Sequence, residues 1–170
     1  QSQQTPFSVM YKKYKSDTKA LRLGVDLSFY SNNNSGSANN SFSDNSYGNI
    51  DFTIGIEKQL SLGGKWMWYY GVDAVPVFSF SRSKSYVNDV KTNSNKNHSV
   101  GLGVKPFLGI RYNINSRLYV SAEASAQLTY LISKNVQKNH NPEQAIRDLT
   151  SNNFSFDINP ASGIFIFYRF

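Results

Sequence analysis

Apolar residues occupy every second position in several long segments of this chain. The clearest is residues 49–60, whose apolar positions are Ile50, Phe52, Ile54, Ile56 and Leu60. The same period recurs in residues 21–29, 66–81, 99–114, 117–132 and 163–170. Successive side chains of a β-strand point to opposite faces, so each segment predicts a strand with one apolar and one polar face. Most are as long as the roughly 9 to 11 residues that a tilted strand needs to cross a membrane.

The polar face distinguishes a membrane barrel from a soluble β-sandwich, which also alternates. In a sandwich the polar face meets water, whereas in a barrel it points into a lumen. We assign residues to this face by parity, that is, by their place in the two-residue alternation of each strand. The basic residues assigned in this way are Lys12, Arg22, Lys105, Arg111, Arg117 and Arg169. The acidic ones are Asp26, Asp51, Glu57, Asp73, Glu123 and Asp157. Such a balance suits a narrow lumen filled by ion pairs, because unpaired buried charge is costly. We therefore expect an all-β, antiparallel transmembrane barrel.

Composition is consistent with this expectation. The mean hydropathy of -0.45 and the lack of a long apolar run exclude a membrane helix, but barrels hide their apolar residues at alternate positions. Aromatic residues make up 15% of the chain and gather near strand ends, as in interfacial girdles. No cysteine is present for a disulfide or thiolate site. We expect one domain over residues 1–170, in a mature form that has lost its signal peptide.

The connections fall into two length classes. Short turns are expected at residues 15–18, 61–65 and 115–116, and long loops at residues 31–47, 84–98 and 133–152. In outer-membrane barrels the short turns are periplasmic and the long loops extracellular. The long loops are rich in Asn and Ser, which predicts solvated, mobile segments. In the third, Asn141 and Pro142 suit the start of a short helix.

The strand count is seven by pattern, over residues 7–14, 19–31, 48–60, 66–82, 98–114, 117–132 and 153–170. Bacterial single-chain barrels normally have an even number of strands, with eight the smallest. We expect eight, with three possible origins for the discrepancy. A turn at residues 160–163 splits the last segment, residues 1–14 contribute more than the pattern reveals, or the barrel closes unconventionally or with a partner.

The closing IFIFYRF and the early YKKYKSDTKALRLGV hairpin, together with the alternating strands, resemble the small outer-membrane β-barrel family typified by the OmpA transmembrane domain and OmpX. The combination of an early KALRLG and a terminal YRF is most similar to barrels of Bacteroidota outer membranes. The resemblance implies a bacterial outer-membrane location and a structural, adhesive or accessory role, as a companion or subunit of a larger outer-membrane assembly. It also implies contact with outer-membrane lipid and lipopolysaccharide. Tyr168 and Phe170 would form the signal read by the barrel-insertion machinery. An appended peptidoglycan-binding domain is not expected.

Enzymatic activity is not expected. A lipid A-modifying enzyme would need an imidazole, and only His98 and His140 could supply one. His98 and Ser99 are adjacent on a strand and point to opposite faces, so they do not pair easily. No acyltransferase or deacylase motif is present, and two histidines are a weak basis for a metal site. We expect no cofactor. A narrow channel is the other alternative. The interior of an eight-stranded barrel is just filled by side chains, and here Tyr69, Phe107 and Tyr119 would occupy it together with the ion pairs.

The net charge of +7 is located in loops and rims and does not indicate nucleic-acid binding. The long-loop side carries Arg82, Lys84, Lys91, Lys96, Lys134, Lys138 and Arg147. These could meet lipopolysaccharide phosphates, or be a solvated rim screened by salt. Pro76, Pro106 and Pro160 fall on the lipid face, where each removes a ladder donor and indicates a bulge or a docked face.

Overall fold

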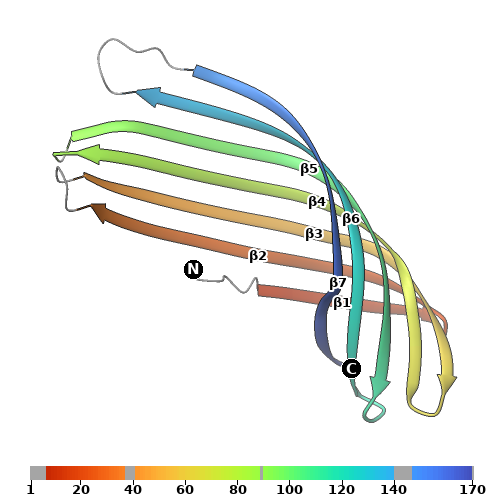
Figure 1. Cartoon of the computed structure of the whole chain (residues 1–170). Coiled ribbons are helices and arrows are strands. Elements are labelled where there is room, and N and C mark those ends of the chain that lie inside the picture. The colour runs from red at the N-terminus through yellow and green to blue at the C-terminus, as the bar shows by residue number, and fades with distance from the viewer. Residues whose placement is uncertain (1–6, 37–40, 89, 140–146, 170) are drawn as a thin grey trace.

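The computed structural model describes residues 7–36, 41–88, 90–139 and 147–169, which form a single antiparallel sheet (Figure 1). Its strands are β1 (Phe7–Ser16), β2 (Lys19–Gly36), β3 (Ser41–Gly63), β4 (Trp66–Val87), β5 (Val90–Asn113), β6 (Leu118–Asn139) and β7 (Arg147–Tyr168). Each strand pairs with the next along the chain, in the order β1 to β7. The expected all-β antiparallel meander is therefore confirmed.

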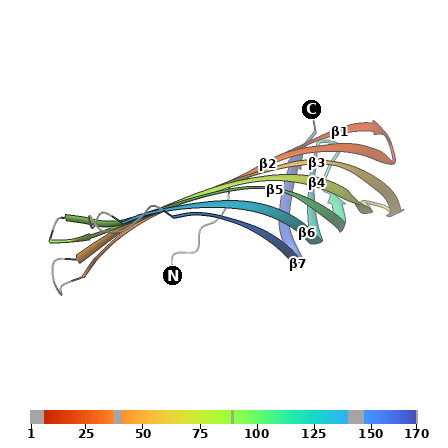
Figure 2. The same cartoon turned by 90° about the horizontal axis from the view of Figure 1, so that it is seen from above.

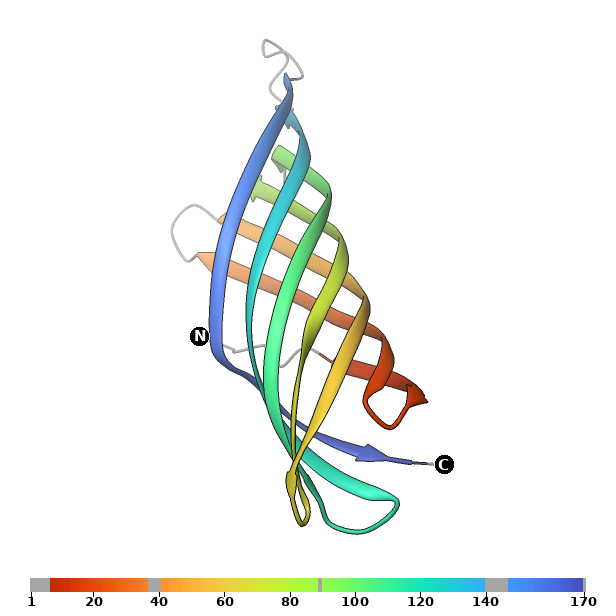
Figure 3. The ribbon, with the colours of Figure 1, turned by 90° about the vertical axis from the view of Figure 1, so that its right-hand side faces the viewer.

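The two ends of the sheet differ in curvature. Seen from above, the end with the longest hairpins is a thin twisted ribbon, and the opposite end is curved so that one face of the sheet is concave (Figure 2). The side view shows the strands crossing this curled end obliquely (Figure 3). We call this concave face of the sheet the inner face. Because the side chains alternate, one set of residues lines the inner face and the other set lies outside.

The strands continue well beyond the segments expected from apolar alternation. The expected long loop at residues 31–47 is mostly ladder, with pairs such as Asn32↔Asn45 and Asn34↔Ser43. The loop expected at residues 84–98 is likewise strand up to Val87 and from Val90 onward. Backbone hydrogen bonds hold a ladder whatever the side chains are, and the stacked rings of Phe42 and Tyr86 add contact there. The expectation of long mobile loops is wrong for the described residues.

The short helix expected after Asn141 falls largely outside the described residues. Arg147, Asp148 and Leu149, at its end, belong to β7. No helix in the described part of the chain is long and apolar enough to cross a membrane.

Strand β7 contains an interruption. Asn159 pairs with Ser125 and Gly163 with Glu123, so residues 160–162 lie opposite the single residue Ala124. This bulge divides β7 into an upper arm, residues 147–159, and a lower arm, residues 163–168. Counted separately, the arms give eight strand segments in an antiparallel meander. Both arms run antiparallel to β6, so the chain does not reverse, as expected for one long strand rather than a hairpin.

The other two prolines also coincide with gaps in the ladders. Pairing of β3 with β4 skips Pro76, and pairing of β5 with β6 skips Pro106. Neither gap contains an extra residue, so the expected bulge is found only at Pro160. A missing N–H accounts for all three interruptions, since proline cannot donate to a ladder.

The sheet is not closed into a barrel. Among the described residues, β1 pairs only with β2 and β7 only with β6. The two edge strands differ in length, with 10 residues in β1 and 22 in β7. Strand β1 is too short to run beside both arms of β7, which leaves the upper arm as an open edge.

Two aromatic rings cover glycines of the neighbouring strand on the inner face. Tyr69 of β4 lies opposite Gly109 of β5, and Phe107 of β5 lies opposite Gly71 of β4. A Cβ atom added at Gly109 would overlap the Tyr69 ring, and one at Gly71 would come within 2.6 Å of Phe107. The absence of a side chain at these glycines therefore leaves room for the two rings on the inner face.

Replacing Gly109 should destabilise the sheet because the added Cβ would overlap the Tyr69 ring and lie 2.5 Å from the carbonyl oxygen of Ala122. We expect Gly109→Ala to lower the free energy of unfolding by about 1–3 kcal/mol, measured by urea unfolding with tryptophan fluorescence. Gly103→Ala is the matched control on the same strand, since its Cβ would lie no closer than 3.1 Å to a neighbour. Equal losses in the two variants would contradict the ring-over-glycine packing.

Candidate functional site

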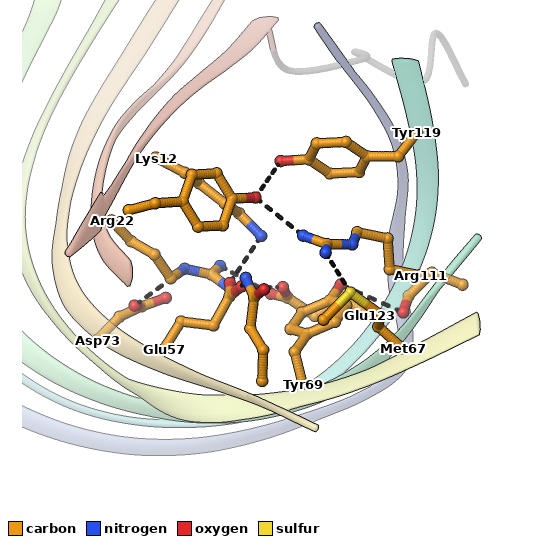
Figure 4. Close-up of polar contacts among 12 residues, drawn as sticks. Lys12, Arg22, Glu57, Met67, Tyr69, Asp73, Arg111, Tyr119 and Glu123 are labelled. Atoms are coloured by element: carbon orange, nitrogen blue, oxygen red, sulfur yellow. Dashed lines mark hydrogen bonds and ion pairs between the residues drawn. The ribbon is translucent and has the colours of Figure 1, made fainter. Parts of the chain in front are cut away.

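Arg22 of β2 is the centre of a buried charge network on the inner face (Figure 4). Its side chain is 0% exposed. It donates two hydrogen bonds to Glu123, from Nη1 to Oε2 at 2.8 Å and from Nη2 to Oε1 at 3.1 Å. Nη1 also donates to Glu57 Oε2 at 3.2 Å. Nε lies 3.3 Å from Asp73 Oδ1, an ion pair without hydrogen-bond geometry. One guanidinium thus joins carboxylates from β3, β4 and β6.

Two lysines complete the network. Lys12 Nζ of β1 donates to Glu57 Oε2 at 2.6 Å, and Lys105 Nζ of β5 lies 3.9 Å from Asp73 Oδ2. Gln59 donates to the second oxygen of Glu57 at 2.5 Å. Alternation assigns both Lys12 and Gln59 to the polar face, but Gln59 is uncharged and was not counted in the expected charge network. Every strand from β1 to β6 therefore contributes a charged group to one cluster.

Aromatic rings form the walls of this cluster. The Arg22 guanidinium carbon lies 3.6 Å from the centre of the Phe107 ring. Lys12 Nζ lies 4.6 Å from the ring centres of both Tyr69 and Phe167. Cations over ring faces gain electrostatic attraction that strengthens as water is excluded. The charges are thus held by rings as well as by opposite charges.

A second inner cluster lies toward the short turns. Tyr14 of β1 shares a hydrogen bond with Tyr119 of β6 at 2.8 Å and accepts one from Arg111 Nη1 at 2.9 Å. Arg169 lies with its guanidinium carbon 5.3 Å from the Tyr14 ring. Sequence reasoning missed Tyr14, although it has the same parity as Lys12. Neither Arg111 nor Arg169 has an acidic partner within the described residues.

The remaining residues expected on the inner face lie outside these clusters. Asp26 and Asp51 are directly opposite each other on β2 and β3 and line a cavity of about 560 Å³ on the long-hairpin side of the network. Asp157 is exposed on the upper arm of β7. Arg117 lies in the turn before β6, where its carbonyl accepts a hydrogen bond from the Arg169 amide. Parity thus predicted the inner face for Asp26 and Asp51 without indicating their height along it, whereas Arg117 belongs to no strand and Asp157 is exposed.

The expected insertion signal lies at the end of β7. Tyr168 is 54% exposed there, and Phe170 lies outside the described residues.

The structure separates His98 from Ser99, as expected for adjacent residues of one strand. His98 is exposed on β5 opposite Lys134, while Ser99 is buried on the other face and bonded to Ser133. His140 lies outside the described residues. In the described part of the chain, no group of three or more metal-ligating side chains lies close enough to hold an ion.

Comparison with known proteins gives no relative: no family model, curated protein or solved structure matches this chain.

Removing Arg22 should be far more harmful than removing a surface cation. We expect Arg22→Met to lower the free energy of unfolding by about 3–5 kcal/mol, because it removes the guanidinium that joins three buried carboxylates. Lys84→Met is the control, since Lys84 is only partly buried and forms a 3.9 Å pair with Asp44, and it should cost about 1 kcal/mol or less. Urea unfolding of both variants measures the difference. Similar losses would show that the network contributes little.

Proposed function

We propose that this protein is an integral outer-membrane β-barrel with a structural or accessory role, a companion or subunit of a larger outer-membrane assembly. The observation that carries the proposal is the inverted distribution of its side chains. Arg22 and Asp73 are 0% exposed, whereas Ile56 is 63% and Leu102 is 57% exposed. A soluble protein buries its large apolar residues and exposes its charges. The reverse suits a chain surrounded by hydrocarbon.

The exposed apolar residues form a continuous band. We call residues that are paired across neighbouring strands a rung of the sheet. On one rung, Ile50 lies beside Phe78, Phe78 beside Val100 and Val100 beside Ile132. Exposed patches of this size on a monomer usually mark a contact with a partner or a membrane. A band that crosses several strands, with aromatic residues at its margins, matches the lipid-facing belt of a barrel.

Closure of the sheet in the membrane would join β1 to the lower arm of β7. Six successive antiparallel pairings make these two segments run in the same direction. Lys12 contacts Phe167, and Tyr14 contacts Arg169, so the contacts advance together on both strands. This is the alignment of a parallel pair. A groove lined by residues 10–14 of β1 and residues 166–169 still separates them.

Cysteine pairs should reveal this parallel seam, because the chain has no cysteine of its own. In vesicles, we expect Val9→Cys with Ile164→Cys to form a disulfide under mild oxidation, seen as a mobility shift on a non-reducing gel. Val9→Cys with Tyr168→Cys is the control and should remain reduced, since the parallel alignment places Tyr168 four residues, about 13 Å, beyond Ile164 along the strand. Cross-linking of the control pair would contradict the parallel alignment.

An arginine on the exposed band should oppose membrane insertion. We expect Leu102→Arg to lower stability in lipid by about 2–4 kcal/mol, the cost of a charge on the lipid face at mid-membrane. Val90→Arg is the control, because Val90 is exposed at the far end of β5, beyond the band, and should cost about 1 kcal/mol or less. Urea unfolding in vesicles measures both. Equal stability of Leu102→Arg and the unmodified protein would refute the lipid-facing belt.

A pore is disfavoured by the inner face. The Arg22 network lies between the cavity at Asp26 and Asp51 and a second one of about 520 Å³ at Arg111 and Tyr119. Planar bilayers containing the protein should therefore be silent. Steady single-channel conductance would favour the channel alternative.

The accessory role is tested by gentle detergent extraction from native membranes, followed by sizing and mass spectrometry. Stoichiometric companions in a larger particle would support it. A lone particle near the 19.2 kDa of the chain plus detergent would instead favour a self-contained barrel.

A further inference from the structure

The outer surface above the apolar band carries a cluster of basic side chains on β4, β5 and β6. Register places Arg82 beside Lys96, Lys84 and Lys138 on either side of Ser94, and His98 beside Lys134. Lys91 lies opposite Tyr86 after a bulge, which turns it to the same face. We call Arg82, Lys84, Lys91, Lys96, Lys134 and Lys138 the basic patch.

The basic patch directly adjoins the apolar band. The rung of Phe78, Val100 and Ile132 is followed on the same face by the rung of Phe80, His98 and Lys134. The next rung contains Arg82 and Lys96. Rungs on one face are about 6.6 Å apart along a strand, so cations begin one rung above exposed hydrocarbon. The surface is therefore amphipathic across a sharp boundary.

Acidic residues compensate little of this charge. In the described part of the chain, the patch has one ion pair, between Lys84 and Asp44 at 3.9 Å. Asp148 lies opposite Val136 at the margin on β7. Like charges directly opposite each other on neighbouring strands are destabilising.

Lys91 shows the same crowding. Desolvation, and then the positive charges of Lys84, Arg82, Lys96 and Lys138, lower the pKa of Lys91. The patch therefore carries excess positive charge that a bound anion would neutralise.

We propose that the basic patch binds the phosphate groups of a phosphorylated membrane lipid, whose acyl chains lie on Phe78, Val100 and Ile132. This inference rests on the proposed membrane location. A lipid matches both halves of the surface, since its headgroup is anionic and its chains are apolar, and they are joined at the boundary observed here. Arginine and lysine both bind phosphate by charge-assisted hydrogen bonds. Polybasic segments near a membrane surface gain attraction to anionic lipid with each added cation.

The experiment compares variants of the full chain reconstituted into vesicles of phosphatidylcholine with a small fraction of lipid A. Native mass spectrometry after mild detergent release reports the lipid that stays bound. The neutral variant combines Lys96→Gln, Lys134→Gln and Lys138→Gln, three lysines of the patch on the rungs nearest the band. We expect it to lose at least about tenfold in lipid A retention, because three cations near a phosphate are removed. A charge-preserving variant, with Arg at the same three positions, should retain lipid A as the unmodified protein does.

A second control removes the same charge elsewhere. Lys13→Gln, Lys15→Gln and Lys58→Gln together match the loss of charge at the short-turn end and should leave lipid A retention within about twofold of the unmodified protein. Equal loss in the two neutral variants would overturn the patch in favour of net charge alone. Complete displacement of lipid A by inorganic phosphate would overturn the lipid as its ligand.

Membrane insertion is measured separately, by resistance of the vesicle-bound protein to alkaline extraction. Full insertion of the unmodified protein without any retention of lipid A would refute the patch and leave the proposed barrel intact. Failure to insert into any vesicle would instead refute the proposed function.

Discussion

The ion pairs of Arg22 hold the curled end of this sheet together. A single sheet has no second layer to cover its inner face, so its own side chains have to fill the space that it encloses. Arg22 joins Glu57, Asp73 and Glu123 from three other strands, and the Phe107 ring covers its guanidinium. Taking such charges out of water is costly unless each has partners. The curl brings those partners together, and their pairing in turn fixes the curl.

Alternation along the chain predicted the sheet, its antiparallel order and the face on which Arg22, Glu57 and Glu123 lie. It could not predict which rungs meet. Arg22 and Glu123 are 101 residues apart and touch only because the sheet bends β2 toward β6. Asp26 has the correct parity but lies higher on the inner face, beside Asp51. A period of two carries information about faces and none about heights, which depend on tilt and register.

Two features of the ladders were invisible in the sequence for physical reasons. Apolar alternation stops near Tyr30 and Phe80, although pairing continues to Gly36 and Val87, because the backbone bonds do not depend on apolar side chains. The bulge at Pro160 keeps the outward parity on both sides, since β7 advances from Asn159 to Gly163 while β6 moves from Ser125 to Glu123. The pattern therefore remains regular across a broken ladder.

The extended hairpin of β4 and β5 has a consequence for reach. In the proposed orientation, residues 81–87 and 90–97 continue the sheet beyond the belt by about 20–25 Å, at about 3.3 Å per residue. The hairpin is then a stalk whose tip is the turn at Asn88, and its length along the strands exceeds the Debye length at physiological salt, which is about 8 Å. Charges of the bilayer therefore act most strongly on the cations nearest the belt and weaken toward the tip. In that proposed orientation, substitutions at the tip would change what the protein meets beyond the membrane, while residues at the base of the stalk would set its depth in the bilayer.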